Sequence, residues 1–383
     1  MESTSQIHDS NLFKNAVTLE SFITICVLGK GSYAKVLLVK KKDTEEVYAM
    51  KILSKKKVFE KNQERHVITE KEILAKMNKC PFLVRFYHSF QTPKKLFFVL
   101  EYCPGGELFN LIQKRRRLTE SQTRFFACQI VLALEAMHKN DIIYRDLKPE
   151  NVLIDADGYI KITDFGLSRQ NVVNNDAKSI CGTPEYLAPE VISRLQYGKP
   201  VDWWTLGCII FEMVTGLPPF YKNNRQELFE GIKYENPKLP STLTNEGRSL
   251  IAGLLNKDPT KRLGAKGAFE IKEHPWFFGV NWTFVLEKKY EAPFKVKVGN
   301  DLGIENFDKM FTTLDPESID KDEDVITHRR LTNFSWDMDN SSRRQSKVNN
   351  APFNIEDDNE LPTPDTHLNR PDENHDTQMN IEN

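Results

Sequence analysis

The 383-residue chain has little that would take it to a membrane, to nucleic acid or into a disulfide framework. Its formal net charge is −1, so it lacks the basic excess that favours binding to nucleic acid and anionic membranes. The most apolar stretch, 206–214, is too short to span a bilayer and contains Glu212, and no signal peptide opens the sequence. The six cysteines form no C-x-x-C pair, which is typical of reduced thiols. We expect a soluble cytoplasmic monomer, with the nucleus left open, no nucleic-acid partner and no transmembrane segment.

The pattern of apolar residues along the chain indicates two lobes of different secondary structure. Apolar and β-branched residues predict strands around 22–39 and over 47–52, an amphipathic helix over about 62–78 and a further strand over 97–102. After a Pro-Gly-Gly breaker at 104–106 the chain turns helical, with a long apolar run at 125–138. A small strand-rich lobe followed by a helical lobe, with the chemistry at their junction, is an α+β arrangement.

The strongest chemical signal is Tyr-Arg-Asp-Leu-Lys-Pro-Glu-Asn-Val at 144–152, followed by Asp-Phe-Gly at 164–166. Moving the γ-phosphoryl of ATP to a hydroxyl needs a carboxylate to orient the acceptor, a cation on the phosphate and oxygen ligands for Mg²⁺. Asp146 is the candidate base, Lys148 the candidate cation, and Asn151 and Asp164 the candidate metal ligands. The order and spacing resemble the H-R-D-L-x-x-x-N and D-F-G signature of protein kinases, with Tyr144 in place of histidine.

An upstream segment completes this signature. Gly29-Lys30-Gly31 opens a run similar to the G-x-G-x-x-G-x-V loop that covers phosphates, with Ala34 at the third glycine. Lys51 would pair the phosphates, held by Glu70 on the predicted helix. Taken alone, the glycines indicate a turn and the two charges a solvated surface. A dinucleotide-binding oxidoreductase would need a helix directly after the glycines, where the sequence predicts a strand. A catalytically silent pseudokinase scaffold is the other alternative.

Over roughly residues 20 to 337 the chain resembles the AGC group of serine/threonine kinases, similar to protein kinases A, B and C and the serum- and glucocorticoid-regulated kinases. The markers are the Tyr-Arg-Asp form of the loop, the run 181–190, the Asn-Phe-Asp at 306–308 and a hexad at 331–336. This hexad is similar to the group's hydrophobic motif, with Leu331 at its first aromatic position.

The resemblance implies a bilobal kinase fold, with a small β-rich N-lobe carrying one regulatory helix, a larger helical C-lobe and a wrapping C-terminal tail. The expected divisions are a flexible arm at 1–21, a catalytic domain at 22–278, an AGC-type tail with its hydrophobic motif at 279–337, and a disordered Asn- and Asp-rich tail at 338–383.

The resemblance also implies ATP and Mg²⁺ as cofactors, and proteins with basic residues as substrates. Residues that would bind the nucleotide are Leu28, Gly29, Gly31, Val36, Ala49, Lys51, Glu70, Glu101, Cys103, Glu107 and Leu153. Glu107 and Glu150 match positions that receive a basic side chain upstream of the acceptor. Either could also be a solvent-facing charge.

Two serines are the expected regulatory phosphorylation sites, Ser179 and Ser335. A phosphate on Ser179 would seek the basic side chains of His66, Arg145 and Arg169. Ser335 would dock with its aromatic neighbours on the small lobe, where the family suggests Lys55, Val58, Phe59 and Lys71. An upstream activating kinase would dock through this motif.

Three further expectations concern the surface and the tail. Glu190 would pair with Arg262. The basic runs 55–57 and 115–117 would be solvated faces, with a basic docking patch as the alternative. The turn-motif site stays open among Thr312, Thr313 and Ser318. The sequences Arg329-Arg330-Leu331-Thr332 and Arg343-Arg344-Gln345-Ser346 fit an arginine-directed kinase, so autophosphorylation of the tail is a hypothesis.

Overall fold

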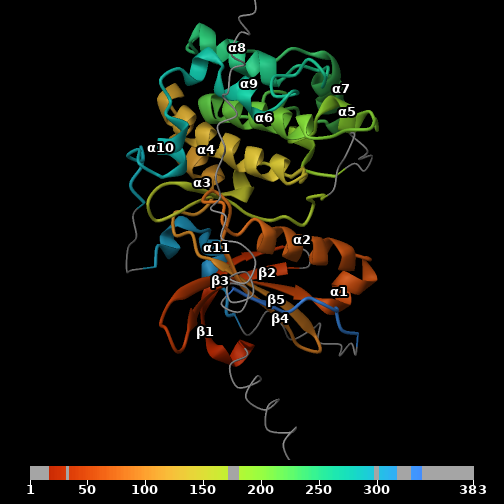
Figure 1. The fold of residues 1–383 in the computed structure, drawn as a ribbon, viewed down its shortest axis with the longest axis vertical. Helices are drawn as coiled ribbons and strands as arrows, with labels where there is room; N and C mark the ends of the chain where they lie inside the picture. The colour runs from red at the N-terminus through yellow and green to blue at the C-terminus, as the bar shows by residue number, and fades with distance from the viewer. Residues whose placement is uncertain (1–16, 32–33, 171–180, 297–301, 317–328, 339–383) are drawn as a thin grey trace, which may run out of the picture.

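Alternating apolar residues build an antiparallel sheet in the smaller lobe, at the bottom of Figure 1. The computed structural model describes residues 17–31, 34–170, 181–296, 302–316 and 329–338. Within these residues the strand order is β1-β2-β3-β5-β4-β8. The strands are β1 (Phe22–Lys30), β2 (Ala34–Lys41), β3 (Val47–Ser54), β4 (Phe86–Gln91), β5 (Lys95–Glu101) and β8 (Trp336–Asp337).

The predicted helix of the small lobe is α2 (Glu64–Lys76), which buries Val67, Ile73 and Leu74 on one face. A second, shorter helix, α1 (Lys55–Glu60), precedes it and was not expected; the Ser54 hydroxyl caps it by accepting from the Lys57 N–H. The expectation of a solvated basic run was wrong for Lys55, whose side chain is only 2% exposed. The small lobe therefore presents two helices from its own sequence.

The larger lobe is helical and forms the upper half of Figure 1. Its longest helix, α4 (Glu120–Lys139), is started by a capping box in which Thr119 and Gln122 exchange hydrogen bonds. It packs against α6 (Pro200–Thr215), which buries Trp203 and Trp204, the expected core pair. The remaining α-helices are α3 (Leu108–Arg115), α5 (Pro189–Ile192), α7 (Arg225–Tyr234), α8 (Asn245–Leu254), α9 (Ala268–Lys272) and α10 (Trp282–Leu286).

Short elements connect these layers. A hairpin of β6 (Val152–Ile154) and β7 (Ile160–Ile162) follows the 144–152 loop and ends two residues before Asp164. Single 3₁₀ turns occur at η1 (Leu19–Ser21), η2 (Pro149–Asn151), η3 (Pro184–Tyr186), η4 (Pro275–Phe277) and η6 (Ile304–Asn306). The hairpin thus delivers both carboxylate-bearing loops to the same place.

The expected Glu190–Arg262 pair is present and buried. Both guanidinium nitrogens donate to the carboxylate, at 2.6 and 2.8 Å, and Arg262 also donates to the carbonyls of Asn256 and Pro200. Bidentate geometry supported by further hydrogen bonds to backbone carbonyls is the arrangement in which a buried ion pair holds its position. The pair fixes the segment around 188–192 to the base of the large lobe.

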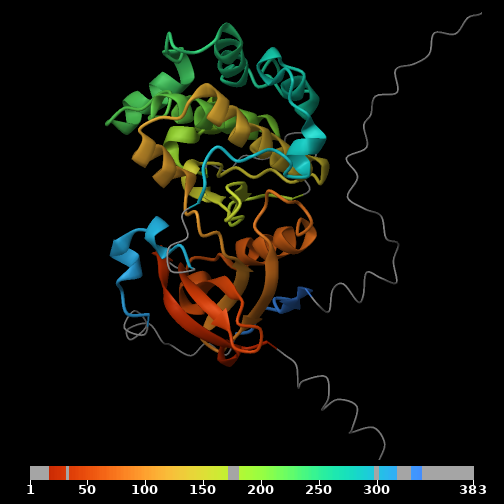
Figure 2. The same ribbon diagram turned by 90° about the vertical axis from the view of Figure 1, so that its left-hand side faces the viewer.

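The tail returns to the small lobe as expected. Figure 2 shows two of its described segments, 302–316 and 329–338, on opposite sides of the sheet. In the first, Phe307 stacks on Tyr102 and α11 (Lys309–Thr312) lies against β1. In the second, β8 pairs with β4 at the sheet edge.

The α+β bilobal prediction is confirmed by this architecture. Residues 1–16 of the expected arm, residues 339–383 of the expected 338–383 tail, and Ser179 and Ser318 lie outside the described residues. In the described part of the chain, no helix is long and apolar enough to cross a membrane.

Candidate active site

Three charged side chains from three different elements meet between the lobes. The Nζ of Lys51 on β3 lies 2.6 Å from Oε1 of Glu70 on α2 and 3.0 Å from Oδ1 of Asp164. Asp164 follows β7 and adopts a positive φ of 60°. The structure therefore brings together the sheet, the regulatory helix and the Asp-Phe-Gly segment through a single ammonium group.

The charges of this triad depend on one another. Burial lowers the pKa of Lys51, but the carboxylates of Asp164 and Glu70 outweigh it and raise that pKa above its usual value. The Lys51 charge in turn lowers the pKa of Asp164. Burial raises the pKa of Glu70, and Lys51 opposes this rise. Lys51 is thus held as a cation, ready to face phosphate oxygens.

A buried carboxylate fixes the shape of the catalytic loop. Asp202 on α6 accepts from the backbone N–H groups of Tyr144 and Arg145, at 3.0 and 2.9 Å, and contacts Nε2 of His138 at 2.7 Å. These contacts stabilise Arg145 at a φ of 68°, which is costly for a side chain of this size. Sequence reasoning missed this role of Asp202.

The loop's reactive groups point to a common centre. The amide nitrogen of Asn151 donates to the carbonyl and the carboxylate of Asp146, at 2.8 and 2.9 Å. Lys148 Nζ lies 3.5 Å from the same carboxylate and donates to the Thr183 hydroxyl at 3.0 Å. Burial raises the pKa of Asp146, while Lys148 and Asn151 oppose the rise. A carboxylate of this kind can accept a proton from a neighbouring hydroxyl.

The residues present suit magnesium better than a tightly coordinated transition metal. Among the described residues no group of three His, Cys, Asp or Glu side chains could hold a metal ion. Mg²⁺ is commonly bound by only one or two protein oxygens together with substrate phosphates. Asn151 and Asp164 offer such a pair of oxygen-bearing side chains at this junction.

An apolar cluster lies beside the charged triad. Leu28, Val36 and Ala49 belong to it. Tyr102, directly after β5, and Phe307, in the tail, pack against it. A Cβ added at Gly29 would meet nothing within 4 Å, and one at Gly31 only an ordinary contact. Packing within the chain does not require these glycines, so the open space suits close approach of a ligand.

Other expected nucleotide contacts are placed more specifically. The Glu101 carboxylate is engaged by Lys161 at 2.8 Å and by the Arg85 N–H at 3.0 Å. The Cys103 thiol is buried. Both residues could therefore reach a nucleotide only through their backbone groups. Leu153 on β6 bridges to Glu107, beneath the same cluster.

A group of glutamates lies next to the catalytic loop. Burial and the nearby Glu150 raise the pKa of Glu107 to about 7. Burial also raises the pKa of Glu212 to about 7, although its carboxylate accepts from the Tyr186 hydroxyl at 2.6 Å. One buried oxygen of Glu150 has no hydrogen-bond partner. Glu212 was missed as a site residue, although it is the single charge in the most apolar stretch of the sequence, 206–214.

The expected basic pocket is partly in place. Burial and then the charge of Arg145 lower the pKa of His66, so the α2 histidine lies within the electrostatic reach of the loop arginine. Arg169 exchanges backbone hydrogen bonds with Ile143, directly before the catalytic loop. Ser179, the group they were expected to bind, falls outside the described residues.

The hydrophobic motif is docked on the small lobe. Phe334 is fully buried against Phe98, and Trp336 stacks on Phe86 with ring centroids 4.3 Å apart. Backbone groups of the motif are held by the side chains of Lys55, Lys71, Ser89 and Gln91. Leu331 is buried here, and Ser335 is exposed directly before β8. Sequence reasoning missed Ser89, Gln91 and the two phenylalanine rings.

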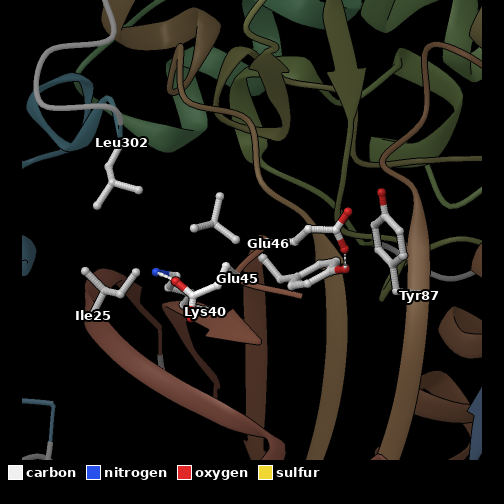
Figure 3. A pocket seen from close by; sticks show the side chains of 8 residues that line it. Ile25, Lys40, Glu45, Glu46, Tyr87 and Leu302 are labelled. Carbon is white, nitrogen blue, oxygen red and sulfur yellow. Dashed lines mark hydrogen bonds and ion pairs between the residues drawn. The ribbon is translucent and has the colours of Figure 1, made fainter. Parts of the chain in front are cut away.

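A separate cavity of about 600 Å³ opens on the outer part of the small lobe (Figure 3). Its charged groups are already paired, because Glu46 accepts from Tyr48 at 2.6 Å and Lys40 pairs with Glu45. It contains none of the triad or loop residues, and we assign it no chemistry.

Comparison with known proteins agrees with this geometry. The protein kinase domain family matches residues 22–277. The chain is 47% identical over 303 residues to the human serine/threonine-protein kinase Sgk1, which covers 78% of this chain and 70% of the relative. It is 44% identical over 301 residues to the Saccharomyces cerevisiae serine/threonine-protein kinase YPK1, which covers 78% of this chain and 44% of the relative. The matched part therefore spans less than half of the yeast relative.

Replacing Lys51 by methionine should destabilise the fold in a pH-dependent way. Glu70 would lose its counter-ion while staying buried, so its pKa would rise further and the folded state would bind a proton more readily than the unfolded chain. We expect a loss of about 3–5 kcal/mol at pH 8 that shrinks as the pH falls to 6. Thermal and denaturant unfolding across this range would measure it.

Two controls accompany this variant. Lys51→Met combined with Glu70→Gln should lose the pH dependence. Lys139→Met should change little, because the Lys139 side chain is exposed and its partner Glu135 keeps Lys272 as a second cation. A pH profile of Lys51→Met parallel to that of the unmodified protein would contradict the assignment.

Proposed function

The chain belongs to the protein kinase family, and within it to the AGC group. On this premise we propose that it phosphorylates serine and threonine residues of proteins that carry arginine upstream of the acceptor. The observation that carries the proposal is the Lys51–Glu70–Asp164 triad, closed within 3.0 Å beside the Asp146 loop. A closed triad is the arrangement needed for phosphoryl transfer in protein kinases.

Each residue of the site has a role that follows from its charge. Lys51 binds the phosphates of ATP, and the apolar cluster around Leu28 receives the base. Asp146 orients the acceptor hydroxyl and takes its proton, while Lys148 faces the phosphoryl group as negative charge spreads over it. Protein kinases use Mg²⁺ with ATP, and Asn151 and Asp164 would hold it here, where it neutralises phosphate charge.

The alternative of a silent pseudokinase scaffold finds no support. A scaffold would have no need to keep Lys51 charged, Asp146 buried beside an amide and Lys148 within reach of both the base and Thr183. The departure at Ala34 leaves β2 intact, pairing with β3 from its first residue.

The glutamate group supports a preference for basic substrates. Glu150 lies close enough to both Glu107 and Glu212 to raise the pKa of each, in addition to the effect of burial. In the described residues no ion pair engages any of these three carboxylates. A peptide arginine placed among them would relieve this repulsion and pair with a fixed acceptor.

We further propose that phosphorylation at Ser179 and Ser335 activates the enzyme. Burial and then the positive charge of Arg145 lower the pKa of His66, and a phosphate would be attracted to the Arg145 charge. A doubly charged group there would tie α2, with Glu70, to the loop with Asp146. An upstream activating kinase would engage the hydrophobic motif when it leaves the groove it occupies on this chain.

We also propose a monomer located in the cytoplasm, with access to the nucleus. None of the six cysteines forms a disulfide, which suits a reducing compartment. Light scattering of the purified chain and microscopy of a tagged chain would check these two points.

Asp164→Asn should abolish phosphate transfer while leaving the fold in place. The change removes the charge that pairs with Lys51 and would hold the metal, so we expect incorporation of labelled phosphate into an arginine-containing serine peptide to fall by at least about 100-fold. Asp157→Asn, on the exposed turn of the neighbouring hairpin, is the matched control and should keep full activity. Equal rates for the two variants would overturn the proposed function.

Substrate binding should weaken in mild acid. With a pKa of about 7, Glu107 is ionised at pH 8 and mostly protonated at pH 6, so its attraction for arginine fades over this interval. At saturating ATP, we expect KM for an arginine peptide to rise by about tenfold from pH 8 to pH 6. In Glu107→Gln, and for a peptide with glutamine in place of arginine, this rise should shrink; a flat profile for the unmodified pair would refute the role.

Ser179→Ala should lower kcat/KM by at least about 100-fold in protein treated with its activating kinase, because the charge that orders the triad and the loop is lost. Peptide kinetics with phosphate mapping by mass spectrometry would measure it. Ser193→Ala, at an exposed serine after α5, is the control that should behave normally. Full activity of Ser179→Ala would remove the switch.

A further inference from the structure

Two ion pairs join the sheet of the small lobe to the hairpin that follows the catalytic loop. The first is the Lys51–Asp164 pair of the triad, at 3.0 Å. In the second, Nζ of Lys161 on β7 lies 2.8 Å from the carboxylate of Glu101, the last residue of β5. Glu101 was an expected nucleotide contact, whereas no motif of the sequence singles out Lys161.

The strands place these two ion pairs at opposite ends of a frame. Glu101 lies opposite Tyr48 in the ladder of β3 and β5, and Lys51 follows Tyr48 by three residues on β3. On the other side, Asp164 follows Lys161 by three residues, and β7 ends between them. Three residues of extended chain span up to about 10 Å. The long sides of the frame are therefore β3 and the end of β7, and its short sides are the two ion pairs.

The Glu101 end of the frame is held by further contacts. The Glu101 carboxylate also accepts from the backbone N–H of Arg85 at 3.0 Å, and the Glu101 N–H donates to the Arg85 carbonyl at 2.8 Å. Ile162, next to Lys161 on β7, exchanges backbone hydrogen bonds with the segment before β4. The Lys161 side chain is only 8% exposed, so its ammonium group has little water to replace the carboxylate. Each end of the frame is thus fixed before a ligand binds.

The two ends of the frame face different parts of a nucleotide. Glu101 comes directly before Tyr102, which packs against the apolar cluster that receives the base. Lys51 and Asp164 stand at the end that receives the phosphates. A ligand that reaches both ends must match the spacing between them, and small errors of position in a fixed site are costly. A change in the spacing therefore weakens such a ligand more than a ligand that reaches one end.

We propose that Lys161 is a positioning residue for the nucleotide, because its ion pair with Glu101 sets the distance between the base end and the phosphate end of the site. The inference rests on the proposed function and adds a residue that acts through Glu101 without touching the nucleotide. An ion pair that only stabilised the fold would not favour one ligand over another. The effect of Lys161 is selective and falls on ligands that span the frame.

The test uses the full chain and compares two ligands by titration calorimetry, adenosine alone and ADP with Mg²⁺. Adenosine reaches only the base end, whereas ADP reaches both ends. In Lys161→Met we expect the Kd of ADP with Mg²⁺ to rise by about tenfold and that of adenosine by less than about twofold. In phosphate transfer to an arginine-containing peptide, KM for ATP should rise in parallel, while kcat and KM for the peptide stay within about twofold.

Two further variants separate the spacing from other effects of the change. Because Lys161→Met leaves a carboxylate without its cation, Lys161→Met combined with Glu101→Gln removes both charges and should show the same selective loss. This double variant also decides the test if the single variant does not fold. The matched control is Lys288→Met, which removes a cation 2.9 Å from Asp157 at the turn of the same hairpin, away from the frame. It should keep the affinity for both ligands.

Each outcome decides the matter. Equal losses for adenosine and ADP, unchanged affinity for both, or normal binding of ADP by the double variant would overturn this inference and leave the proposed function standing. A fall in kcat with an unchanged KM for ATP would do the same. If the unmodified chain binds neither ligand and transfers no phosphate to the peptide, the proposed function is wrong and the inference falls with it.

Discussion

One ammonium group joins the parts of this molecule that matter for its chemistry. Lys51 lies on the sheet, Glu70 on helix α2, and Asp164 two residues after the β6–β7 hairpin. Each of the three charges is stable between the lobes because the other two lie beside it. Burial of Glu70 without Lys51 would leave an unpaired carboxylate, and Lys51 without both acids would lose its charge. The geometry of the site is thereby coupled to the position of α2, and any contact that moves α2 acts on the site.

The tail acts on α2 and its surroundings in this way. Its last described segment fills a groove made by α1, α2 and β4, where Lys55 and Lys71 hold backbone carbonyls and Phe86 and Phe98 face Trp336 and Phe334. The earlier segment covers the apolar cluster through Phe307. Two surfaces of the small lobe are thus covered by tail residues that lie far away in the sequence.

Much of the fold and of the candidate site could be predicted from the sequence, because a few reactive residue types occur in an order and spacing that is rare by chance. The order of Asp146, Lys148, Asn151 and Asp164 indicated phosphoryl transfer, and strong periodicity located α2 and α4. The elements that were missed are those whose structure depends on distant partners. Helix α1 exists on a basic run because Lys55 turns inward to a tail carbonyl, and Asp202 fixes a loop 57 residues away in the sequence. Glu212 becomes significant only when Tyr186 and Glu150 are brought beside it.

The pairing of β8 with β4 affects how well the protein resists aggregation and degradation in a cell. Trp336 and Asp337 cover the open side of the last strand contributed by the small lobe itself. Proteolytic clipping ahead of residue 329 would uncover backbone amides and carbonyls of β4 together with the rings of Phe86 and Phe98. An edge of that kind recruits strands from other chains. Loss of the tail would then lead to aggregation and clearance of the enzyme, beyond any loss of its regulation.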